Sequence, residues 1–533
     1  MKYEQKPDKN SIDLNELSKE ELIHKLLVSD KKIDELEKQI NWMNEQLILS
    51  KKKIFGTSSE KTQSPNQMSF FNEAESDSDP KIPEPQIEEV TYRRRKKKGK
   101  READLEALPL EVITYELPLS ECVCPVCEES LHKMSKEVRT ELVYVPASFK
   151  RIQHERFIYA CRECQKNKES TPIIKAKAPA AMIKNSIASA SLVSGIINGK
   201  YVNSLPLYRQ EKEFKRYGIF VSRQNMANWI IRCANDYFTP LYNLMRMELL
   251  SRDILHADET TTQVLKEPDR KPTTKSYMWL YRTRPEHKPV VLFEYQMTRE
   301  AKHPKTFLQN YKGYLQVDGY SSYHSLSEDI IIVGCFAHSR RRFDEALQVI
   351  PENDRAGSKS QEGMQFCNAL FEIEREIKDL ADDKKQQIRT DRSQPLLDQF
   401  HNWLVTTQSE VLPKSKIGQA IYYALEQWQY LKNYMLDSRL EISNNLAERS
   451  IRPFCVGRKN HLFSDTQNGA YASAVIYSLV ETAKENNLKP YEYFNYLLSN
   501  MPDSDFRENP ERLQDFLPWS DKIPEICVIP KSE

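Results

Sequence analysis

Five strand-like runs in the middle of the chain constrain its fold most. Each is rich in aliphatic, aromatic or β-branched residues, and a helical pattern follows from residue 339. Strands in this order followed by a helix fit a mixed sheet that is flanked by helices. The runs cover residues 252–263, 276–283, 288–296, 313–318 and 330–336.

Two of these runs end in an aspartate, and a later helix carries a glutamate that can complete a metal site. Asp258 closes the apolar stretch 254–258 of the first run, Asp318 closes the fourth run, and Glu448 lies one turn after Asn444 in a short helix rich in Asn and Arg. If the two strands are neighbours, both aspartates reach one edge of the sheet. Carboxylate oxygens are the ligands that Mg²⁺ or Mn²⁺ prefers, and a pair of such ions can promote phosphodiester cleavage and joining.

Each of these carboxylates also has an ordinary structural interpretation. An aspartate at a strand end often forms a turn, and Glu448 with Arg452 is an i,i+4 ion pair of a common kind. Glu259 and Asp437 are rival candidates on local grounds. Spacing alone therefore does not select three residues from the 77 acidic ones.

Charge is balanced over the whole chain but segregated near its beginning. The 533 residues include 78 basic and 77 acidic side chains, a net charge of +1, which gives no global field that would mark a nucleic-acid partner. Residues 72–90 are acidic, and residues 93–101 are basic apart from one glycine. The basic block is either part of a solvated linker or a contact to DNA phosphates.

A heptad repeat in residues 22–50 predicts a coiled coil. Charged residues flank the repeat, and Ser29 and Ser50 interrupt one of its two series. The alternative is a single amphipathic helix that packs on its own protein; we expect a homo-oligomer. The apolar positions are Leu26, Ile33, Ile40 and Leu47 in one series and Leu22, Leu36 and Met43 in the other.

Two Cys-x-x-Cys pairs predict a structural Zn²⁺ site with the ligands Cys124, Cys127, Cys161 and Cys164. Four thiolates can surround zinc tetrahedrally. Strand-like runs at 138–145 and 156–159 would form a ribbon that brings the two pairs together. A redox-active dithiol needs a single pair in a βαβ setting, and the spacing of Cys122 from Cys124 disfavours it as a substitute ligand.

A helical region precedes the strands and has the pattern of a helix-turn-helix. Gly218 lies in a turn, and Ser222 can cap the helix that follows. Such a helix can enter the major groove of DNA, where Arg, Gln and Asn read base edges. These residue types are also common on ordinary protein surfaces. The candidate DNA contacts are Arg209, Arg223, Gln224 and Asn228.

Motifs spread over nearly the whole chain resemble, in family order, the transposases of the insertion sequence 66 family. Residues 54–60, 205–210 and 476–484 and the two cysteine pairs extend the resemblance outward, and His461 stands where the family usually shows Trp. The central motifs are Asp258-Glu259-Thr260, Val317-Asp318-Gly319-Tyr320, Ala337-His338-Ser339-Arg340-Arg341-Arg342-Phe343, Asn444-Asn445-Leu446-Ala447-Glu448-Arg449 and Gly457-Arg458-Lys459-Asn460.

The resemblance implies an RNase H-like mixed α/β catalytic domain with a DDE triad at Asp258, Asp318 and Glu448 that binds Mg²⁺ or Mn²⁺. The fold class is then multidomain α+β, and the partners are double-stranded DNA, further copies of the chain and small accessory proteins of the same element. The basic residues near Glu448 become candidate DNA contacts: Arg449, Arg452, Arg458 and Lys459.

The expected domain boundaries follow the patterns above. They are 1–55 for a leucine zipper, 56–105 for a disordered charged linker, 106–175 for the zinc-binding domain, 176–249 for the helical DNA-binding region, 250–343 and 437–470 for the two parts of the catalytic core, 344–436 for a helical insertion, and 471–533 for a C-terminal helical region.

The sequence is compatible with three kinds of function. The resemblance favours an enzyme that cleaves and joins DNA at the ends of a mobile element. A DNA-binding regulator or inactive copy, and an RNase H-like nuclease or resolvase, are the alternatives. The first residues lack the apolar core of a signal peptide, and no apolar run approaches the roughly 18 residues that span a bilayer. We therefore expect a cytoplasmic bacterial protein without a membrane partner.

The cysteine pairs give a first test. Metal analysis of the purified protein should find about one zinc ion per chain, because four thiolates in paired knuckles form a closed site. Cys161→Ser should lose the zinc and the folding of this domain, whereas Cys122→Ser should keep both. A Cys161→Ser protein with full zinc content would contradict the assignment.

Overall fold

The computed structural model describes residues 18–55, 148–160 and 173–530. The elements discussed below belong to one compact unit, Met1–Gly56 with Arg156–Ile529. Among the residues that the structure describes, no helix combines the length and apolar character that crossing a membrane requires. The four cysteines of the expected zinc site, the linker and the basic block at 93–101 lie outside the described residues.

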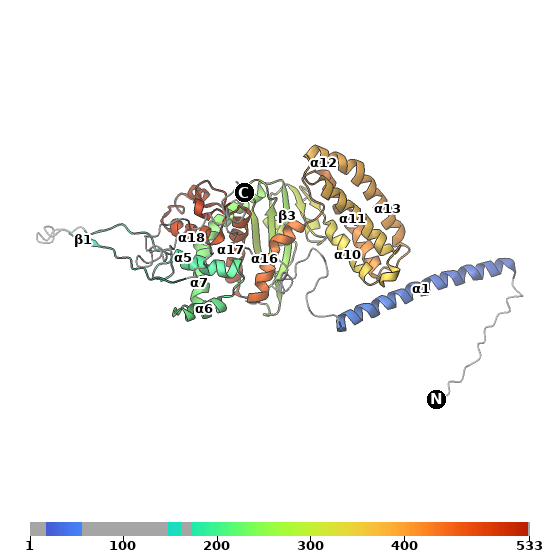
Figure 1. Cartoon of the computed structure of the whole chain (residues 1–533), viewed down its shortest axis with the longest axis horizontal. Helices are drawn as coiled ribbons and strands as arrows, with labels where there is room; N and C mark the ends of the chain where they lie inside the picture. Colours follow the sequence, from blue (N-terminus) through green and yellow to red (C-terminus); the bar gives the residue numbers. More distant parts are fainter. Residues whose placement is uncertain (1–17, 56–147, 161–172, 531–533) are drawn as a thin grey trace, which may run out of the picture. The chain divides into compact units, whose positions relative to one another are not determined.

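The expected mixed sheet is present and has six strands (Figure 1). Its order is β5-β4-β3-β6-β7, and β8 pairs with the far end of β3. The first three strands form an antiparallel meander, whereas β3, β6 and β7 are parallel. The strands are β3 (Ile254–Lys266), β4 (Lys275–Thr283), β5 (Val291–Gln296), β6 (Gly313–Gln316), β7 (Ile330–Val333) and β8 (Ser464–Thr466).

One predicted strand boundary is wrong. Asp258 does not end a strand but lies in the middle of β3, which continues to Lys266. The reason is the long hairpin with β4, which pairs every residue of β3 from Leu255 to Gln263. On the other side of β3, the parallel partner β6 ends after His256↔Gln316, so Asp258 still lies where the neighbouring strand stops.

Helices cover the sheet and its edges. α16 (Asn445–His461) contacts β3, and α17 (Gln467–Glu485) contacts the edge strand β5. Hydroxyl groups of α17 accept hydrogen bonds from the backbone of this edge: Ser478 Oγ from Phe293 N at 2.7 Å and Thr482 Oγ1 from Val291 N at 3.0 Å. These bonds satisfy backbone groups that a free edge would leave unpaired.

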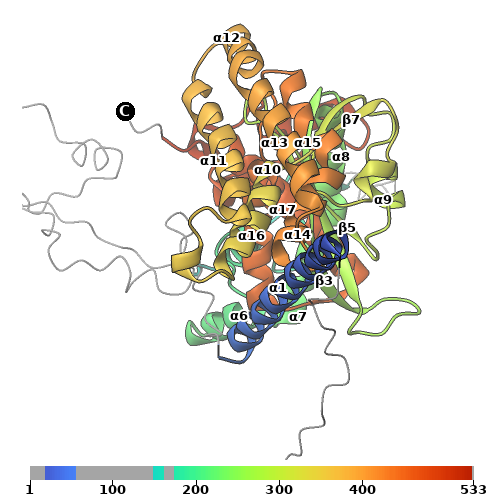
Figure 2. The ribbon, with the colours of Figure 1, turned by 90° about the vertical axis from the view of Figure 1, so that its right-hand side faces the viewer.

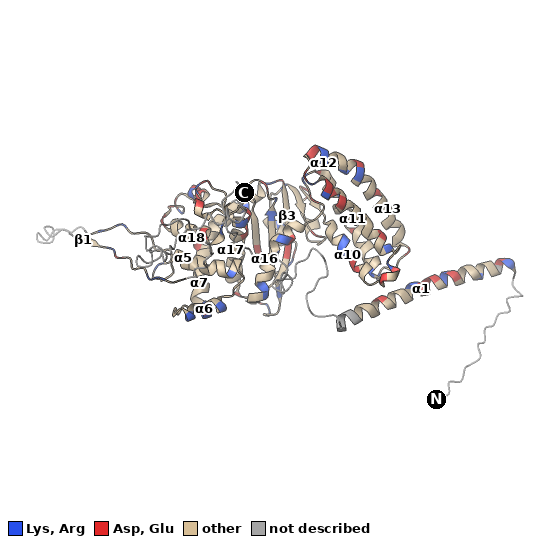
Figure 3. Ribbon diagram, viewed as in Figure 1, with Lys and Arg blue, Asp and Glu red and all other residues tan. Residues whose placement is uncertain are grey.

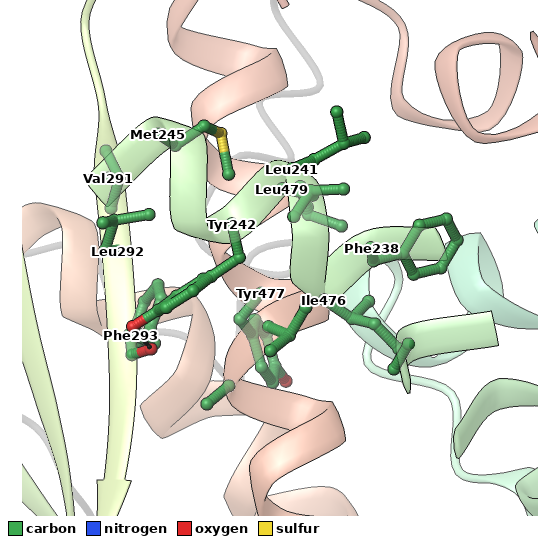
Figure 4. Packing of buried hydrophobic residues seen from close by; sticks show 14 of the residues in the cluster. Phe238, Leu241, Tyr242, Met245, Val291, Leu292, Phe293, Ile476, Tyr477 and Leu479 are labelled. Carbon is green, nitrogen blue, oxygen red and sulfur yellow. Dashed lines mark hydrogen bonds between the residues drawn. The ribbon is translucent and has the colours of Figure 1, made fainter. Parts of the chain in front are cut away.

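The largest hydrophobic core lies between α17, β5 and α8 (Thr239–Leu250) (Figure 4). Tyr242 of α8 is buried and donates its hydroxyl to Phe293 O at 3.1 Å. Tyr477 of α17 packs edge-on against Tyr201 at 5.0 Å between ring centroids. The same core includes residues of α5 (Ala190–Ile197), α7 (Arg223–Cys233) and α18 (Pro490–Asn500).

Residues 344–436 form helices with a second core, as the sequence pattern predicts. Together with α10 (Phe336–Gln348), helices α11 (Lys359–Ile377), α13 (Gln394–Gln408) and α14 (Lys416–Glu426) lie side by side (Figures 1 and 2). Phe343, Phe400 and Leu404 are fully buried there. The remaining elements are α6 (Leu207–Arg216), α9 (Lys302–Phe307), α12 (Asp382–Ile388), α15 (Trp428–Leu431) and the antiparallel pair β1 (Ile158–Ala160) and β2 (Ile173–Lys175).

The heptad segment is a single helix, α1 (Lys19–Phe55), whose seam is exposed. The exposed fractions are 62% for Leu26, 53% for Ile33, 45% for Leu36, 56% for Ile40 and 59% for Leu47. An apolar stripe of this kind is buried when it packs against a partner helix. The exposure agrees with the oligomer that the sequence predicts, which stays a prediction.

Replacing two seam residues should therefore dissociate the oligomer. Ile33→Asp with Ile40→Asp puts charge into the interface, and light scattering should show a mainly monomeric protein. Lys31→Asp with Lys38→Asp, on the far side of the helix, is the control and should keep the subunit number of the unchanged protein. Equal subunit numbers for both variants would mean that α1 does not assemble the protein.

Candidate active site

The parallel pairing of β3 with β6 brings Asp258 and Asp318 to one edge of the sheet. The register pairs His256 with Gln316, and each aspartate follows two residues later. Local backbone groups orient both side chains. Asp258 Oδ1 accepts from Glu259 N at 2.8 Å, and Asp318 Oδ1 accepts from Tyr320 N at 3.0 Å. Two of the three expected carboxylates are thus positioned by adjacent strands.

Asn444 fixes the start of α16, and with it Glu448, against β3. Its Nδ2 donates to Ala257 O at 2.7 Å, and its Oδ1 lies 3.1 Å from Nδ1 of His256. Because Asn444 Oδ1 is an acceptor, His256 Nδ1 is the donor in this pair. Burial lowers the pKa of His256 to about 3, so the imidazole is neutral. The bond spans two residues that are 188 positions apart in the chain.

Two further contacts hold α16 in place. Gln316 of β6 donates to Ser443 O at 3.1 Å, immediately before the helix. Near the other end of the helix, Arg458 donates to Thr260 Oγ1 at 3.1 Å and also to the backbone oxygen of Thr261. The helix is therefore anchored on the strands that carry both aspartates.

Helix α10 supplies two more groups to the site. His338 Nε2 lies 3.8 Å from Glu448 Oε1, and Arg341 Nη2 lies 3.7 Å from Glu448 Oε2. Ligand atoms of Cys335, His338 and Glu448 all lie within 4.8 Å of one another. Burial lowers the pKa of His338, although Glu448 and Asp318 act in the opposite direction.

Sequence reasoning did not assign a role to Cys335 or to His338. The signal that could have found them is the Cys-x-x-His spacing at the start of a helix, which places both side chains on one face. His338 also lies inside a motif that carries the resemblance, next to three consecutive arginines.

Electrostatic repulsion distinguishes this cluster from ordinary surface acids. Burial raises the pKa of Asp258 well above its usual value, and the charges of Glu259, Asp318 and Glu448 raise it further. Strongly perturbed carboxylates are concentrated at functional sites. A divalent cation would remove this repulsion.

The two rival carboxylates, Glu259 and Asp437, already accept hydrogen bonds from other side chains. Glu259 points to the opposite face of β3, where its Oε1 accepts from Arg299 Nε at 2.9 Å and its Oε2 accepts from Tyr323 OH at 2.6 Å. Asp437 accepts two hydrogen bonds from the Arg439 guanidinium, at 3.0 and 2.8 Å. The oxygens of both side chains are therefore less available to a metal ion than those of the cluster around Asp258.

The donor set fits a divalent ion. Oε1 of Glu448 is buried and has no hydrogen-bond partner in the described part of the chain. An uncompensated carboxylate oxygen of this kind is costly unless a cation neutralises it. Asp258, Asp318 and Glu448 offer the oxygen atoms that Mg²⁺ or Mn²⁺ takes.

The expected DNA contacts fall into two groups. Arg209, Arg223, Gln224 and Asn228 are exposed on α6 and α7. Gly218 has a φ of +76° in the turn between these helices, and Ser222 Oγ accepts from Asn225 N at 3.2 Å as the cap of α7. A turn with φ > 0 suits glycine, and together these features form the helix–turn–helix arrangement that the sequence predicts.

The second group lies on α16. Arg449, Arg452 and Lys459 are exposed there. Arg458 is different, because its guanidinium bonds to β3 and so supports the fold. The blue segments of the ribbon mark Lys and Arg residues on both α6 and α16 (Figure 3). Contact of these residues with DNA stays a prediction.

Two amide variants should change stability in opposite directions. In metal-free protein at about pH 8, Asp258→Asn removes a carboxylate whose pKa is raised in the folded state. It should raise Tm by about 2–4 °C, the shift that about 1 kcal/mol produces in a domain of ordinary size. Glu259→Gln should lower the unfolding free energy by about 2 kcal/mol, because it breaks a hydrogen-bonded charge pair.

The pH dependence has a defined sign. A carboxyl with a raised pKa in the folded state stabilises the protein at low pH and loses this contribution as pH rises through the folded-state pKa. Protein without Mg²⁺ or Mn²⁺ should therefore gain stability from Asp258 as the pH falls through the folded-state pKa of this carboxyl, and Asp258→Asn should remove that gain. Differential scanning fluorimetry measures both effects. A Tm that falls in Asp258→Asn would show that its charge is compensated.

Family comparisons cover most of the chain. The model described as "Transposase IS66 family" matches residues 185–472, and "zinc-finger binding domain of transposase IS66" matches residues 121–165. The "IS66 C-terminal element" matches residues 478–519, and "Transposase C of IS166 homeodomain" matches residues 42–113. The zinc-finger match contains all four predicted zinc ligands.

Two relatives from Sinorhizobium fredii, both named only as uncharacterized proteins, are similar over most of their length. The protein y4jD is 29% identical over 419 residues, which are 76% of this chain and 79% of the relative. The protein y4qI is 30% identical over 405 residues, which are 73% of this chain and 72% of the relative. With one family model matching more than half of the sequence, the chain belongs to the IS66 family of transposases.

Proposed function

We propose that this chain is an active DNA transposase that cleaves and joins DNA strands at the ends of an insertion sequence. Asp258, Asp318 and Glu448 are the DDE triad of an RNase H-like domain, and residues 344–436 are a helical insertion in that domain. The observation that carries the proposal is the convergence of the three carboxylates. Asp258 lies on β3 and Asp318 lies just after the parallel strand β6, and the third carboxylate comes from a helix that Asn444 ties to β3.

The three carboxylates have one shared role. They hold Mg²⁺ or Mn²⁺, which when bound activates the attacking oxygen and stabilises the leaving one. Backbone hydrogen bonds to Asp258 and Asp318 orient the ligand oxygens before DNA arrives. A site that is preorganised in this way loses little energy in rearranging its ligands.

DNA binding is assigned to groups outside the triad. The exposed residues Arg223, Gln224 and Asn228 at the start of α7 suit a major groove, and the exposed basic residues of α16 lie on the helix that carries Glu448. Zinc binding at Cys124, Cys127, Cys161 and Cys164 and self-association through α1 complete the proposal. Together they would let two copies hold two DNA ends. The proposal also includes small accessory proteins of the same element as partners. It places the protein in the cytoplasm, in association with the nucleoid.

Amide variants of the triad test the chemistry. Asp258→Asn, Asp318→Asn and Glu448→Gln keep the size of each side chain but remove the charge that holds the metal. Each should lower the rate of strand cleavage by on the order of 10³-fold or more, which corresponds to about 4 kcal/mol of barrier. Binding to element ends should stay largely intact, because it depends on basic residues and weakens with salt. Cleavage is followed on labelled duplexes that carry the ends.

The matched control is Asp253→Asn. Asp253 lies just before β3, is 61% exposed at its side chain and pairs with Arg439, so its amide should cleave normally. Cleavage by Glu448→Gln in Mg²⁺ would place the site on the wrong carboxylates. Binding without cleavage by the unchanged protein would instead support a regulator or inactive copy, and equal cleavage of unrelated branched duplexes would support a nuclease.

A further inference from the structure

The start of α10 places an imidazole beside the carboxylate of Glu448 without a hydrogen bond between them. His338 Nε2 and Glu448 Oε1 are 3.8 Å apart, which is beyond hydrogen-bond distance. Glu448 Oε1 is buried, and among the residues that the structure describes neither this oxygen nor Nδ1 of His338 has a hydrogen-bond partner. Both side chains are about a quarter exposed, so small solutes can reach them.

This separation fits two ligands of a single ion. Donor atoms at about 2.1 Å from one metal lie about 3.0 Å apart at a cis-octahedral angle and about 3.4 Å apart at a tetrahedral angle. The distance of 3.8 Å exceeds the tetrahedral value by a few tenths of an ångström, which a small rotation of the Glu448 side chain would remove. An ion between the two groups would satisfy the orphaned carboxylate oxygen and one nitrogen of the imidazole together.

The third member of the cluster has a different role. Cys335 is buried, and its Sγ accepts a hydrogen bond from Asn444 N at 3.1 Å. That contact joins the start of α10 to the start of α16. Cys335 therefore sets the distance between His338 and Glu448, and its sulfur is already bonded.

Arginines of α10 do not block this arrangement. Arg341 lies 3.7 Å from the other oxygen of Glu448, Oε2, and its side chain is 56% exposed. Arg342 stacks on the Tyr423 ring, with its guanidinium carbon 4.1 Å from the ring centroid. Oε1, the oxygen that faces His338, is left for the ion.

We propose that His338 is a nitrogen ligand to the same ion that Glu448 binds. The inference rests on the proposed function, in which Glu448 holds a divalent ion. Mg²⁺ takes oxygen ligands, whereas imidazole nitrogen binds first-row transition ions more readily. The mixed nitrogen and oxygen donor set therefore gives this site a preference for Mn²⁺ over Mg²⁺.

Electron paramagnetic resonance of bound Mn²⁺ tests the nitrogen directly. The full-length, zinc-loaded protein is titrated with Mn²⁺ in the absence of DNA. Bound Mn²⁺ should show electron spin echo modulation from a coordinated imidazole nitrogen. His338→Gln should lose this modulation and bind Mn²⁺ about 10-fold more weakly or worse. His401→Gln is the control, because His401 lies on α13 with its ring 5.0 Å from that of Trp428, and it should keep both properties.

The outcomes separate the inference from the proposed function. If the unchanged protein binds Mn²⁺ and Glu448→Gln weakens that binding, but no nitrogen modulation is seen, His338 is not a ligand and the carboxylate site stands. The same conclusion follows if His338→Gln keeps the modulation. If neither Glu448→Gln nor His338→Gln changes Mn²⁺ binding, both the inference and the proposed metal site are wrong. The echo signal of the unchanged protein does not depend on whether a variant folds.

Discussion

The short parallel pairing of β3 with β6 is the constraint on which the candidate site depends. Only three residue pairs define it, from Ile254↔Tyr314 to His256↔Gln316. A slip of one residue would turn one of the aspartates to the opposite face, because side chains alternate along a strand. The polar residues of the last pair prevent such a slip, since His256 is bonded to Asn444 and Gln316 is bonded to Ser443. The register and the position of α16 are therefore fixed by the same hydrogen bonds.

The site combines two adjacent carboxylates whose pKa values are both raised by burial but whose neighbours differ. Glu259 is buried, but Arg299 and Tyr323 stabilise its charge. Asp258, one residue earlier and on the other face, lies near the charges of Asp318 and Glu448, and no cation of the described residues contributes comparably to its pKa. Such an arrangement lowers stability in the absence of metal, as active sites often do. The same strand thus carries an internal ion pair on one face and, on the other, a carboxylate surrounded by like charges.

Much of this architecture could be predicted from local sequence patterns. The five strand-like runs, the heptad helix and the helices of residues 344–436 are present, because periodicity of apolar residues reports which face is buried. The end of β3 lies beyond the expected run, because Val264 and Lys266 pair with β8, a long-range contact that the residues of β3 alone do not indicate. The choice of Asp258 over Glu259 relied on the resemblance and stays a prediction; the ion pair that Glu259 makes on the other face of β3 favours it.

The contribution of α10 could not be derived from sequence spacing. His338 and Glu448 are 110 positions apart, and the intervening helices determine whether they meet. Long-range contacts of this kind depend on tertiary packing, which local propensity does not encode. The Cys-x-x-His spacing is a local signal, but it does not indicate which other segment the two side chains face. The hydrogen bond from Asn444 N to Cys335 Sγ shows that they face the start of α16.

The helices of residues 344–436 are part of the support of the site and not a separate attachment. Arg389 is 2% exposed, and its guanidinium donates to the backbone oxygens of Tyr434, Asp437 and Leu440 at 2.7–2.9 Å. Glu374 compensates its charge at 2.7 Å. These bonds hold the segment that leads into α16, and Leu440 and Ile442 of that segment belong to the second hydrophobic core. Because this segment ends at Asn444, the packing of the helical region determines where Glu448 enters the site.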